Sequence, residues 1–217
     1  MTHRRPTADA PIELPFQPTP LDFDAPPADP VEAFRVWYAD ALQLPVPNPQ
    51  AMTLATVDAD GQPSARVVLL RGFDARGAVF FTNRLSRKGA ALKANPRAAL
   101  LFHWDLLDRQ VRIEGEVSLA GDDESDRYFG QRAVISQIGA WASDQSQPIQ
   151  DRAALERRFH DMERRFGGAP VPRPPHWGGY RVSLGSIEFW QGERHRLHDR
   201  IVYRRMKDGW AGQRLCP

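Results

Sequence analysis

The sequence contains little cysteine and no long apolar run. The single cysteine, Cys216, excludes an internal disulfide and any zinc or iron–sulfur site with several cysteine ligands, and it fits a reducing compartment. No uninterrupted apolar run exceeds about five residues, whereas a signal-peptide core needs roughly seven and a membrane helix about eighteen. We therefore expect a cytoplasmic protein without a membrane segment.

An excess of positive charge is also missing. The 217 residues include 29 Lys and Arg against 27 Asp and Glu, a net charge of +2, which argues against nucleic-acid binding driven by counterion release. Of the 29 basic residues, 26 are Arg and 3 are Lys. Genome base composition is the first explanation, and the preference of Arg for planar phosphate and carboxylate groups is the alternative.

Several motifs of well-known enzyme classes are absent. The chain has no Walker loop, no glycine spacing of a dinucleotide fold and no Gly-x-Ser-x-Gly nucleophile elbow. His195 and His198 are three residues apart and could bind a metal, but no third ligand stands at a useful spacing and the arginines between and beside them would repel a cation. We expect no metal site.

Proline divides the chain into two parts. Eight of the 19 prolines lie within residues 1–30, which lack apolar periodicity, so residues 1–28 are expected to form an extended arm. Asp29 and Pro30 are typical of a helix N-cap and first helical residue, and this first helix should end at Pro45. Residues 29–217 are expected to form a single domain.

The remaining pattern is mostly that of antiparallel strands. Residues 52–57 and 64–71 flank an Asp-Gly turn, which predicts a hairpin. Ser86 should cap a short helix, and apolar residues at helical spacing predict an amphipathic helix over 155–166. The pattern indicates a mainly β, α+β fold, and a barrel would remove the strand edges. The other predicted strands are 78–82, 98–104, 110–119, 180–184, 187–191, 200–205 and 210–214.

The densest group of phosphate donors comprises Arg66, Arg71, Arg87 and Lys88. Arg87 and Lys88 occupy the first turn of the Ser86-capped helix, where free N–H groups and the helix dipole favour an anion. The alternative is a set of surface arginines paired with Asp58, Asp60 or Asp74. The pattern alone does not separate the two interpretations.

A second cationic group lies near the C-terminus. If residues 195–200 are extended, Arg196, His198 and Arg200 share one face, which would suit an anionic heteroaromatic ligand. The alternative is an exposed edge strand without a ligand.

Six segments in order resemble the pyridoxamine 5′-phosphate oxidase family, from about Asp29 to the C-terminus. They are RVVLLRGFDARGAVFFTN, SRKGAALKANPRAALLFHW, RQVRIEGEV, YFGQRAVISQIGAWASDQS, WGGYRVSL and IEFWQGERHRLHDR. The resemblance implies a six-stranded antiparallel FMN-binding split β-barrel with packed helices, working as a homodimer with FMN at the subunit interface. It favours the phosphate-binding interpretation of the first cationic group.

The resemblance also implies which residues bind each ligand, some of them from the partner subunit. The FMN set comprises Arg66, Val67, Val68, Leu69, Arg71, Phe81, Thr82, Arg87, Lys88, Gln110, Gln145, Ser146, Trp190 and Arg200. The substrate phosphate would be held by Arg71, Tyr128, Arg132 and Ser136, and Arg196 and His198 would lie over the pyridine ring as the catalytic pair.

The implied reaction is oxidation of pyridoxamine or pyridoxine 5′-phosphate by O₂ to pyridoxal 5′-phosphate, with H₂O₂ and, from the amine, ammonia. Hydride would pass from the C4′ carbon to FMN, and the protein would hold the two rings face to face and supply positive charge. Arg196 is the residue whose loss should reduce turnover most.

Two departures from the family pattern leave other functions open. Arg71 stands where the family often has Lys, and Arg4-Arg5-Pro6 lacks the tyrosine of the family's N-terminal lid, so a lid is not predicted. Residues 23–30 are similar to the start of the flavin oxidases of phenazine biosynthesis. Such an oxidase is the first alternative, a non-catalytic flavin- or pyridoxal-phosphate-binding protein the second, and an Arg-rich nucleic-acid binder a remote third.

Overall fold

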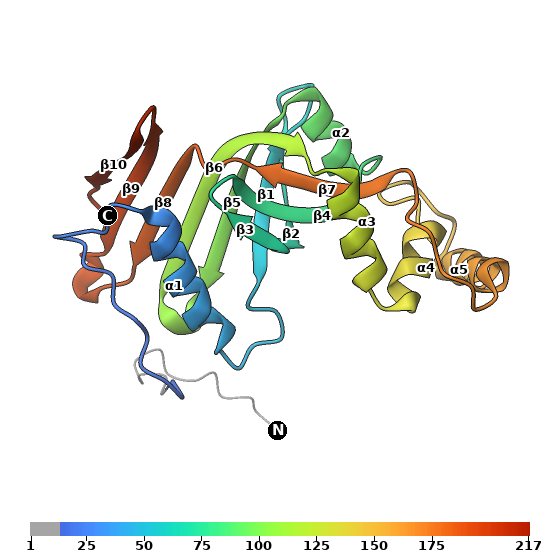
Figure 1. Cartoon of the computed structure of the whole chain (residues 1–217), viewed down its shortest axis with the longest axis horizontal. Helices are drawn as coiled ribbons and strands as arrows, with labels where there is room; N and C mark the ends of the chain where they lie inside the picture. The colour runs from blue at the N-terminus through green and yellow to red at the C-terminus, as the bar shows by residue number, and fades with distance from the viewer. Residues whose placement is uncertain (1–13) are drawn as a thin grey trace.

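Ten antiparallel strands form one strongly curled sheet in the computed structural model, which describes residues 14–217 (Figure 1). The order β10-β9-β8-β6-β5-β1-β2 gives one path through the sheet, and β3, β4 and β7 branch from it at β6. The strands are β1 (Ala51–Val57), β2 (Pro63–Leu69), β3 (Gly72–Asp74), β4 (Gly77–Asn83), β5 (Arg97–Trp104), β6 (Arg109–Leu119), β7 (Trp177–Val182), β8 (Ser186–Gln191), β9 (Asp199–Met206) and β10 (Gly209–Arg214).

Six of these strands make a barrel that is open along one seam. Pairing runs from β2 through β1, β5, β6 and β7 to β4. The ring closes at one end only, where the Arg71 N–H donates to the Val79 carbonyl at 2.8 Å. Elsewhere β2 pairs with β1 alone, so a split remains between β2 and β4. The predicted six-stranded split barrel is confirmed, with four further strands outside the ring.

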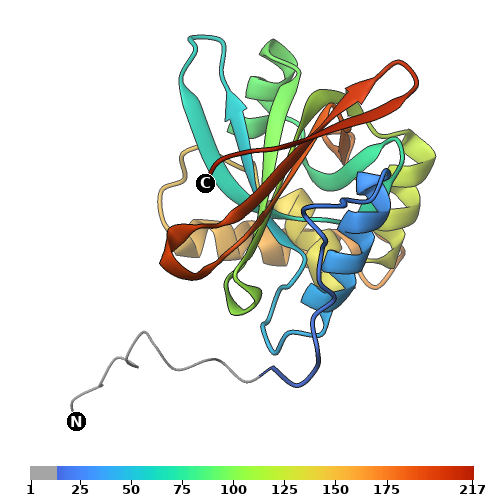
Figure 2. The same cartoon turned by 90° about the vertical axis from the view of Figure 1, so that its left-hand side faces the viewer.

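Strand β6 belongs to two parts of the sheet. Residues 109–114 pair with β8, whereas residues 117–119 pair with β7. Gly115 lies at the junction, where an added Cβ would come within 1.9 Å of the Ser183 carbonyl oxygen, so only glycine allows this close approach. Strands β8, β9 and β10 thereby leave the barrel and form the sheet extension at the left of Figure 1. Figure 2 views the molecule from this side.

Helix α1 (Pro30–Leu42) closes one end of the barrel core. Asp29 caps it by accepting from the Val31 N–H at 2.9 Å, as the Asp-Pro pair predicts. Phe34 is fully buried against aromatic residues of the barrel, including Phe102 at 5.1 Å, and Trp37 is fully buried against Phe189 of β8 at 5.3 Å. The alternating apolar residues of β1 and β5 add to this core.

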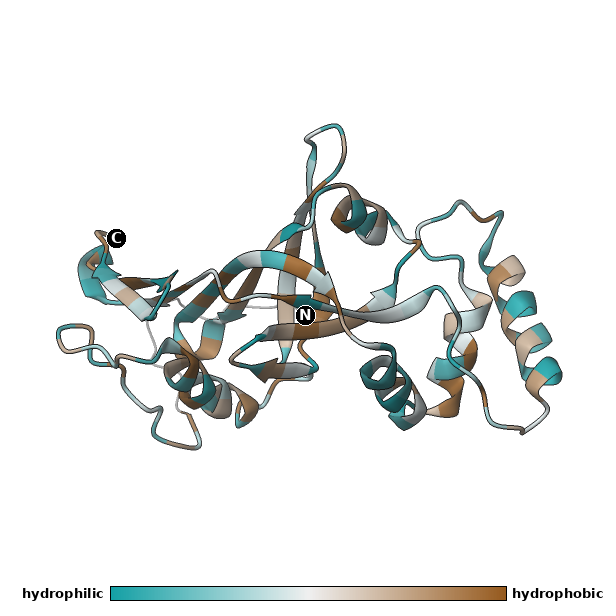
Figure 3. Ribbon diagram, turned by 45° about the horizontal axis from the view of Figure 1, so that its top comes forward, coloured by the Kyte–Doolittle hydropathy of each residue, from teal (hydrophilic) through white to brown (hydrophobic). Residues whose placement is uncertain are grey.

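Three helices lie at the opposite end of the molecule, beside β7: α3 (Asp122–Gln131), α4 (Val134–Ala142) and α5 (Arg152–Phe166). The sequence predicted α5, which ends at Gly167 with a left-handed φ of 51°. Apolar and polar residues alternate around α5, and none of its residues is buried (Figure 3). Helices α3 and α4 were not predicted, because neither helix has a side-chain N-cap. Helix α2 (Arg87–Ala94) follows Ser86 as predicted.

The described part of the predicted arm, residues 14–28, contains no helix or strand. Its apolar side chains Leu14, Phe16, Leu21 and Phe23 nevertheless pack on the barrel core. The question of a lid at Arg4-Arg5-Pro6 lies outside the described residues. Within residues 14–217, no helix is both long and apolar enough to cross a membrane.

Candidate functional site

A cavity of about 700 Å³ occupies the split between β2 and β4 and extends to α3 and α4. Three cationic side chains line it, Arg71, Lys88 and Arg132, and no Asp or Glu does. A cavity with this charge pattern is suited to an anionic ligand. The lining residues are Val67, Val68, Leu69, Arg71, Phe81, Thr82, Asn83, Lys88, Tyr128, Arg132, Ala133, Ser136, Gly139, Ala140, Ser143, Gln145 and Trp177.

Lys88 forms one cationic end of the cavity. Ser86 caps α2 by accepting from the Gly89 N–H, and this places Lys88 in the first turn of the helix. The buried Lys88 Nζ donates to Gln145 Oε1 at 2.8 Å and to the hydroxyls of Thr82 and Ser86, both at 3.1 Å. Burial, with a smaller contribution from the charge of Arg66, lowers the pKa of Lys88 to about 8. Its partners are all neutral, so the positive charge is not compensated.

Arg66 and Arg87 lie beside this end but do not line the cavity. Arg66 donates to the Leu54 carbonyl at 2.9 Å and to the Thr56 hydroxyl at 2.8 Å, so it has no carboxylate partner. Burial and the neighbouring Arg87 lower the pKa of Arg66. Arg87 is exposed and lies 3.7 Å from Asp58, so the surface ion-pair alternative describes Arg87 but not Arg66 or Lys88.

Arg71 and Arg132 form the other cationic end. The guanidinium of Arg71 lies 5.6 Å from the centre of the Tyr128 ring, and that of Arg132 lies 4.8 Å from the centre of the Trp177 ring. Burial, together with the nearby charge of Arg71, lowers the pKa of Arg132. The Arg132 Nη1 is buried and has no hydrogen-bond partner among residues 14–217. A buried donor without a partner is costly, and an anion in the cavity would satisfy it.

The cavity also has a wall of unpaired backbone. Strand β2 pairs with β1 on one side, and its other edge faces the split, where Val67, Val68 and Leu69 line the cavity. The outward N–H and C=O groups of an edge strand are free to bind the polar edge of a planar ligand.

Five other predicted site residues form a separate group on β6, β8, β9 and the loop before β9; we call this group the Trp190 wall. In the strand register Gln110 lies opposite Trp190, and Trp190 opposite Arg200. The ring of His198 is 4.6 Å from that of Trp190. No member lines the cavity. The Trp190 wall comprises Gln110, Trp190, Arg196, His198 and Arg200.

The expectation that Arg196, His198 and Arg200 share one face of an extended strand is wrong. Residues 194–196 form a 3₁₀ turn with φ of 59° at His195 and 61° at Arg196, and β9 begins only at Asp199. The turn closes because the Glu193 N–H donates to His198 Nδ1 at 3.0 Å and the Leu197 N–H donates to the Arg194 carbonyl at 3.2 Å. Such local hydrogen bonds compete with strand formation, and periodicity does not reveal them.

The predicted residues are therefore divided into three sets, and Ser146 lies outside all of them. The cavity brings together Val67, Val68, Leu69, Arg71, Phe81, Thr82, Lys88, Tyr128, Arg132, Ser136 and Gln145. Arg66 and Arg87 adjoin the Lys88 end, and the Trp190 wall is separate. Ser146 follows Gln145 with a left-handed φ of 74° and does not line the cavity.

Sequence reasoning assigned no role to several lining residues, of which Trp177 is the largest. The signal was present, because Trp177 opens the segment WGGYRVSL, but the motif alone does not say what its ring contacts. The other lining residues without a predicted role are Asn83, Ala133, Gly139, Ala140 and Ser143.

Fold and cavity together define a split barrel with a carboxylate-free cavity for an anionic ligand. Residues 39–166 match the family model described as pyridoxamine 5′-phosphate oxidase, and residues 177–217 match the model of the pyridoxine 5′-phosphate oxidase C-terminal dimerisation region. The chain belongs to the pyridoxamine 5′-phosphate oxidase family.

Individual relatives agree with the family models. The chain is 61% identical over 191 residues to a pyridoxine/pyridoxamine 5′-phosphate oxidase of Bordetella avium, covering 88% of this chain and 90% of that protein. A protein of the same name from Rubrobacter xylanophilus is 55% identical over 189 residues, 87% of each chain. Among solved structures, PhzG of Burkholderia lata with tetrahydrophenazine-1-carboxylic acid matches with a TM-score of 0.85 and 32% identity, covering 96% of this chain and 100% of that one.

Proposed function

We propose that the protein is an FMN-dependent oxidase that converts pyridoxamine or pyridoxine 5′-phosphate to pyridoxal 5′-phosphate. Pyridoxine 5′-phosphate and O₂ give the aldehyde and H₂O₂, and the amine substrate additionally consumes water and releases ammonia. The observation that carries the proposal is the single cavity with two cationic ends and no carboxylate in its lining. Two phosphorylated aromatic molecules would match the two ends.

The Lys88 end fits the phosphate of FMN. Lys88 stands at a helix N-terminus with only neutral partners, and Arg66 adds a second uncompensated charge beside it. The free edge of β2 would receive the polar edge of the flavin ring. FMN bound there would accept a hydride from the C4′ carbon of the substrate and pass the electrons to O₂.

The other end fits the substrate phosphate. Arg71 and Arg132 provide two guanidinium groups, and Tyr128 and Ser136 add hydroxyl donors in the same lining. The Arg132 Nη1 that lacks a partner would bind a phosphate oxygen. Anchoring the phosphate orients the rest of the substrate in the cavity, so this end contributes to catalysis by positioning.

The Trp190 wall would complete the site from a second copy of the chain. Its residues lie outside the cavity of their own chain, and the C-terminal segment that contains most of them matches a dimerisation region. Because His198 Nδ1 accepts from the Glu193 N–H, a neutral ring carries its proton on Nε2. His198 would then donate a hydrogen bond to the substrate, and Arg196 would supply positive charge above the pyridine ring.

The phenazine-type oxidase is the second candidate, supported by the TM-score of 0.85 to PhzG. Two observations favour the phosphorylated pyridine. Identity to the pyridoxine/pyridoxamine 5′-phosphate oxidases is 55–61%, against 32% to PhzG. The Arg71 and Arg132 end also offers two guanidinium groups, and a dianionic phosphate compensates both charges more fully than a single carboxylate does.

The direct test is to purify the protein, record its visible spectrum and follow H₂O₂ with pyridoxine 5′-phosphate. We expect a yellow flavoprotein whose flavin absorbance bleaches when substrate is added without oxygen. A protein that binds FMN and pyridoxal 5′-phosphate but shows no bleaching would be a carrier. Bleaching only by reduced phenazine carboxylates would identify the second candidate instead.

A further inference from the structure

Three aromatic rings with nearly parallel planes line the substrate-phosphate end of the cavity, and we call them the aromatic stack. The Phe81 ring lies 4.2 Å from that of Tyr128 at 17° and 5.5 Å from that of Trp177 at 9°. The Tyr128 and Trp177 rings are 6.1 Å apart at 8°. The rings come from β4, α3 and β7, so the stack joins three elements that are distant in the sequence.

The two guanidinium groups of the phosphate end lie on two of these three rings. Arg71 is over Tyr128 at 5.6 Å, and Arg132 is over Trp177 at 4.8 Å. Phe129 also contacts Arg132, at 5.5 Å, and packs edge-on against Trp177 at 5.0 Å. No carboxylate of residues 14–217 lines the cavity beside these two guanidinium groups, so we take the aromatic contacts to orient the two charges.

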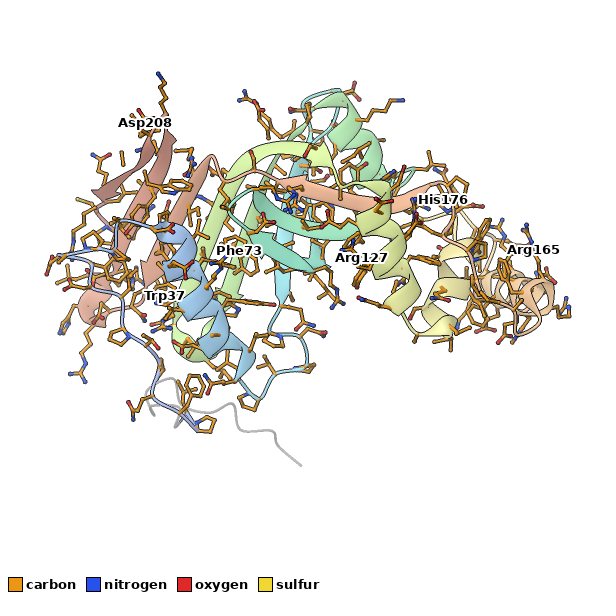
Figure 4. All side chains as sticks on the ribbon, viewed as in Figure 1. Trp37, Phe73, Arg127, Arg165, His176 and Asp208 are labelled. Carbon is orange, nitrogen blue, oxygen red and sulfur yellow. The ribbon has the colours of Figure 1, made fainter. Side chains whose placement is uncertain are left out.

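The segment Trp177-Gly178-Gly179 assembles the stack. Gly179 pairs with Phe81 across β4 and β7, and an added Cβ there would lie 2.8 Å from the Phe81 ring and 2.7 Å from Ala120. The Gly179 N–H donates to Ser125 Oγ at 3.2 Å, one turn before Tyr128 on α3. Figure 4 labels His176, the residue before Trp177, where β7 meets these helices. The glycine therefore gives the Phe81 ring its space and also fixes the helix that carries Tyr128.

We propose that Trp177 is a positioning residue for phosphate recognition, whose ring holds the Arg132 guanidinium flat and directed into the cavity. This inference rests on the proposed function, because it takes the cavity ligand to be a phosphorylated pyridine. Trp177 lines the cavity but carries no charge and no role in hydride transfer. Its loss should weaken binding of the phosphate and leave the chemical step intact.

The test compares Trp177→Leu and Trp177→Phe with Trp141→Leu in the FMN-loaded protein. Trp141 belongs to the same hydrophobic cluster as Trp177 but contacts Arg165 and not Arg132, so it is a matched loss of an indole ring. Binding of pyridoxal 5′-phosphate and of pyridoxal is measured by calorimetry, and KM and kcat with pyridoxine 5′-phosphate are measured alongside. Flavin content and Tm establish that each variant is folded.

We expect Trp177→Leu to weaken pyridoxal 5′-phosphate binding and to raise KM, each roughly tenfold, because a desolvated cation–π contact is lost. The kcat should stay within about twofold of the wild-type value. Pyridoxal binding should not change. Trp177→Phe, which keeps a ring face, should recover to within about threefold, and Trp141→Leu should resemble the wild type. The inference is overturned if Trp177→Leu binds pyridoxal 5′-phosphate like the wild type, or if Trp141→Leu weakens it equally.

If Trp177→Leu does not retain flavin, a double-mutant cycle tests the coupling between residue 177 and Arg132. Arg132→Lys keeps the charge but cannot stack flat, so its effect on binding should be smaller in Trp177→Met, which has no ring face, than in the wild type. Strictly additive effects would overturn the inference. The two hypotheses can fail separately. If the wild-type protein binds pyridoxal 5′-phosphate more tightly than pyridoxal but reduces no oxygen, the proposed function is contradicted and the role of Trp177 in phosphate binding is not.

Discussion

The cavity and the Trp190 wall differ in how their charges are compensated. In the cavity, Lys88, Arg71 and Arg132 have neutral or aromatic partners and no carboxylate. In the wall, Arg200 donates to Glu188 at 2.8 Å and to the Cys216 carbonyl at 2.9 Å. The comparison indicates that the cavity is suited to anions, whereas Arg200 of the wall is already paired with a carboxylate of its own chain.

The wall also has a buried support that the cavity lacks. Arg109, next to Gln110, donates to Asp40 at 2.8 Å, to the Thr19 carbonyl at 2.7 Å and to Gln191 at 2.9 Å. Its guanidinium lies 4.4 Å from the centre of the Trp37 ring. Burial lowers the pKa of Arg109, and the hydrogen bond that Arg109 donates to Asp40 opposes this shift. One ion pair thus joins residues 14–28, α1 and the β6–β8 pair behind the wall.

Removing the Arg109 ion pair should have the largest effect, which is on stability. Arg109→Met leaves the buried Asp40 without a cationic partner, so we expect the free energy of unfolding to fall by about 3–5 kcal/mol. Urea denaturation measures this free energy. Arg164→Met is the control, because the Arg164–Asp161 pair is 72% and 54% exposed, against 4% and 6% for Arg109 and Asp40. A loss below about 1 kcal/mol for Arg109→Met would contradict the role of the pair.

Removing a cavity charge should affect function and not stability. Arg132→Met eliminates the unsatisfied Nη1 and the repulsion from Arg71, so Tm should not fall. Steady-state kinetics with pyridoxine 5′-phosphate should show kcat/KM reduced about 100-fold, because the variant loses charge-assisted hydrogen bonds to the phosphate. Arg165→Met, which removes an arginine stacked on Trp141, is the control. Unchanged kinetics would remove Arg132 from the site.

The pH dependence of FMN binding should identify the Lys88 end. The pKa of Lys88 is lowered to about 8, and a bound phosphate would raise it again, so binding takes up a proton above pH 8. Affinity is full below pH 8 and should fall up to about tenfold per pH unit above it. Quenching of flavin fluorescence measures the Kd. Lys88→Arg should flatten this dependence, and a flat wild-type profile from pH 7 to 9.5 would contradict the assignment.

Changing the type of cation should have the smallest effect. Arg71→Lys keeps the charge at the phosphate end but loses stacking on Tyr128. We expect KM to change by only about two- to fivefold, because an exposed cation–π contact contributes little binding free energy. An increase of tenfold or more in KM would mean that the fork of Arg71 binds the phosphate with both nitrogens.

Most of the fold could be predicted from the sequence. The Asp29–Pro30 helix start, the Asp-Gly hairpin and the Ser86 cap are local signals, and each is confirmed. The barrel followed from the strand pattern and the family resemblance. Helices α3 and α4 were missed because neither begins with a side-chain N-cap, a local signal that the other three α-helices have.

The candidate site was less accessible to sequence reasoning. Motifs identified the cationic residues, but the stack of Phe81, Tyr128 and Trp177 depends on contacts between three elements. The turn at His195 and Arg196 depends on a backbone hydrogen bond to His198, which no periodicity reports. The residue roles remain predictions, and the geometry supports them by grouping eleven of the predicted residues in one cavity.

The most direct test of the account is complementation between two inactive chains. Arg132→Ala removes a cavity charge and Arg196→Ala removes a wall charge, so each variant alone should be nearly inactive. If each site combines the cavity of one chain with the wall of the other, co-expressed variants should recover about a quarter of wild-type turnover, because half of the dimers are mixed and each of these has one intact site. No recovery in purified mixed dimers would show that both residues act within one chain, and would contradict the account.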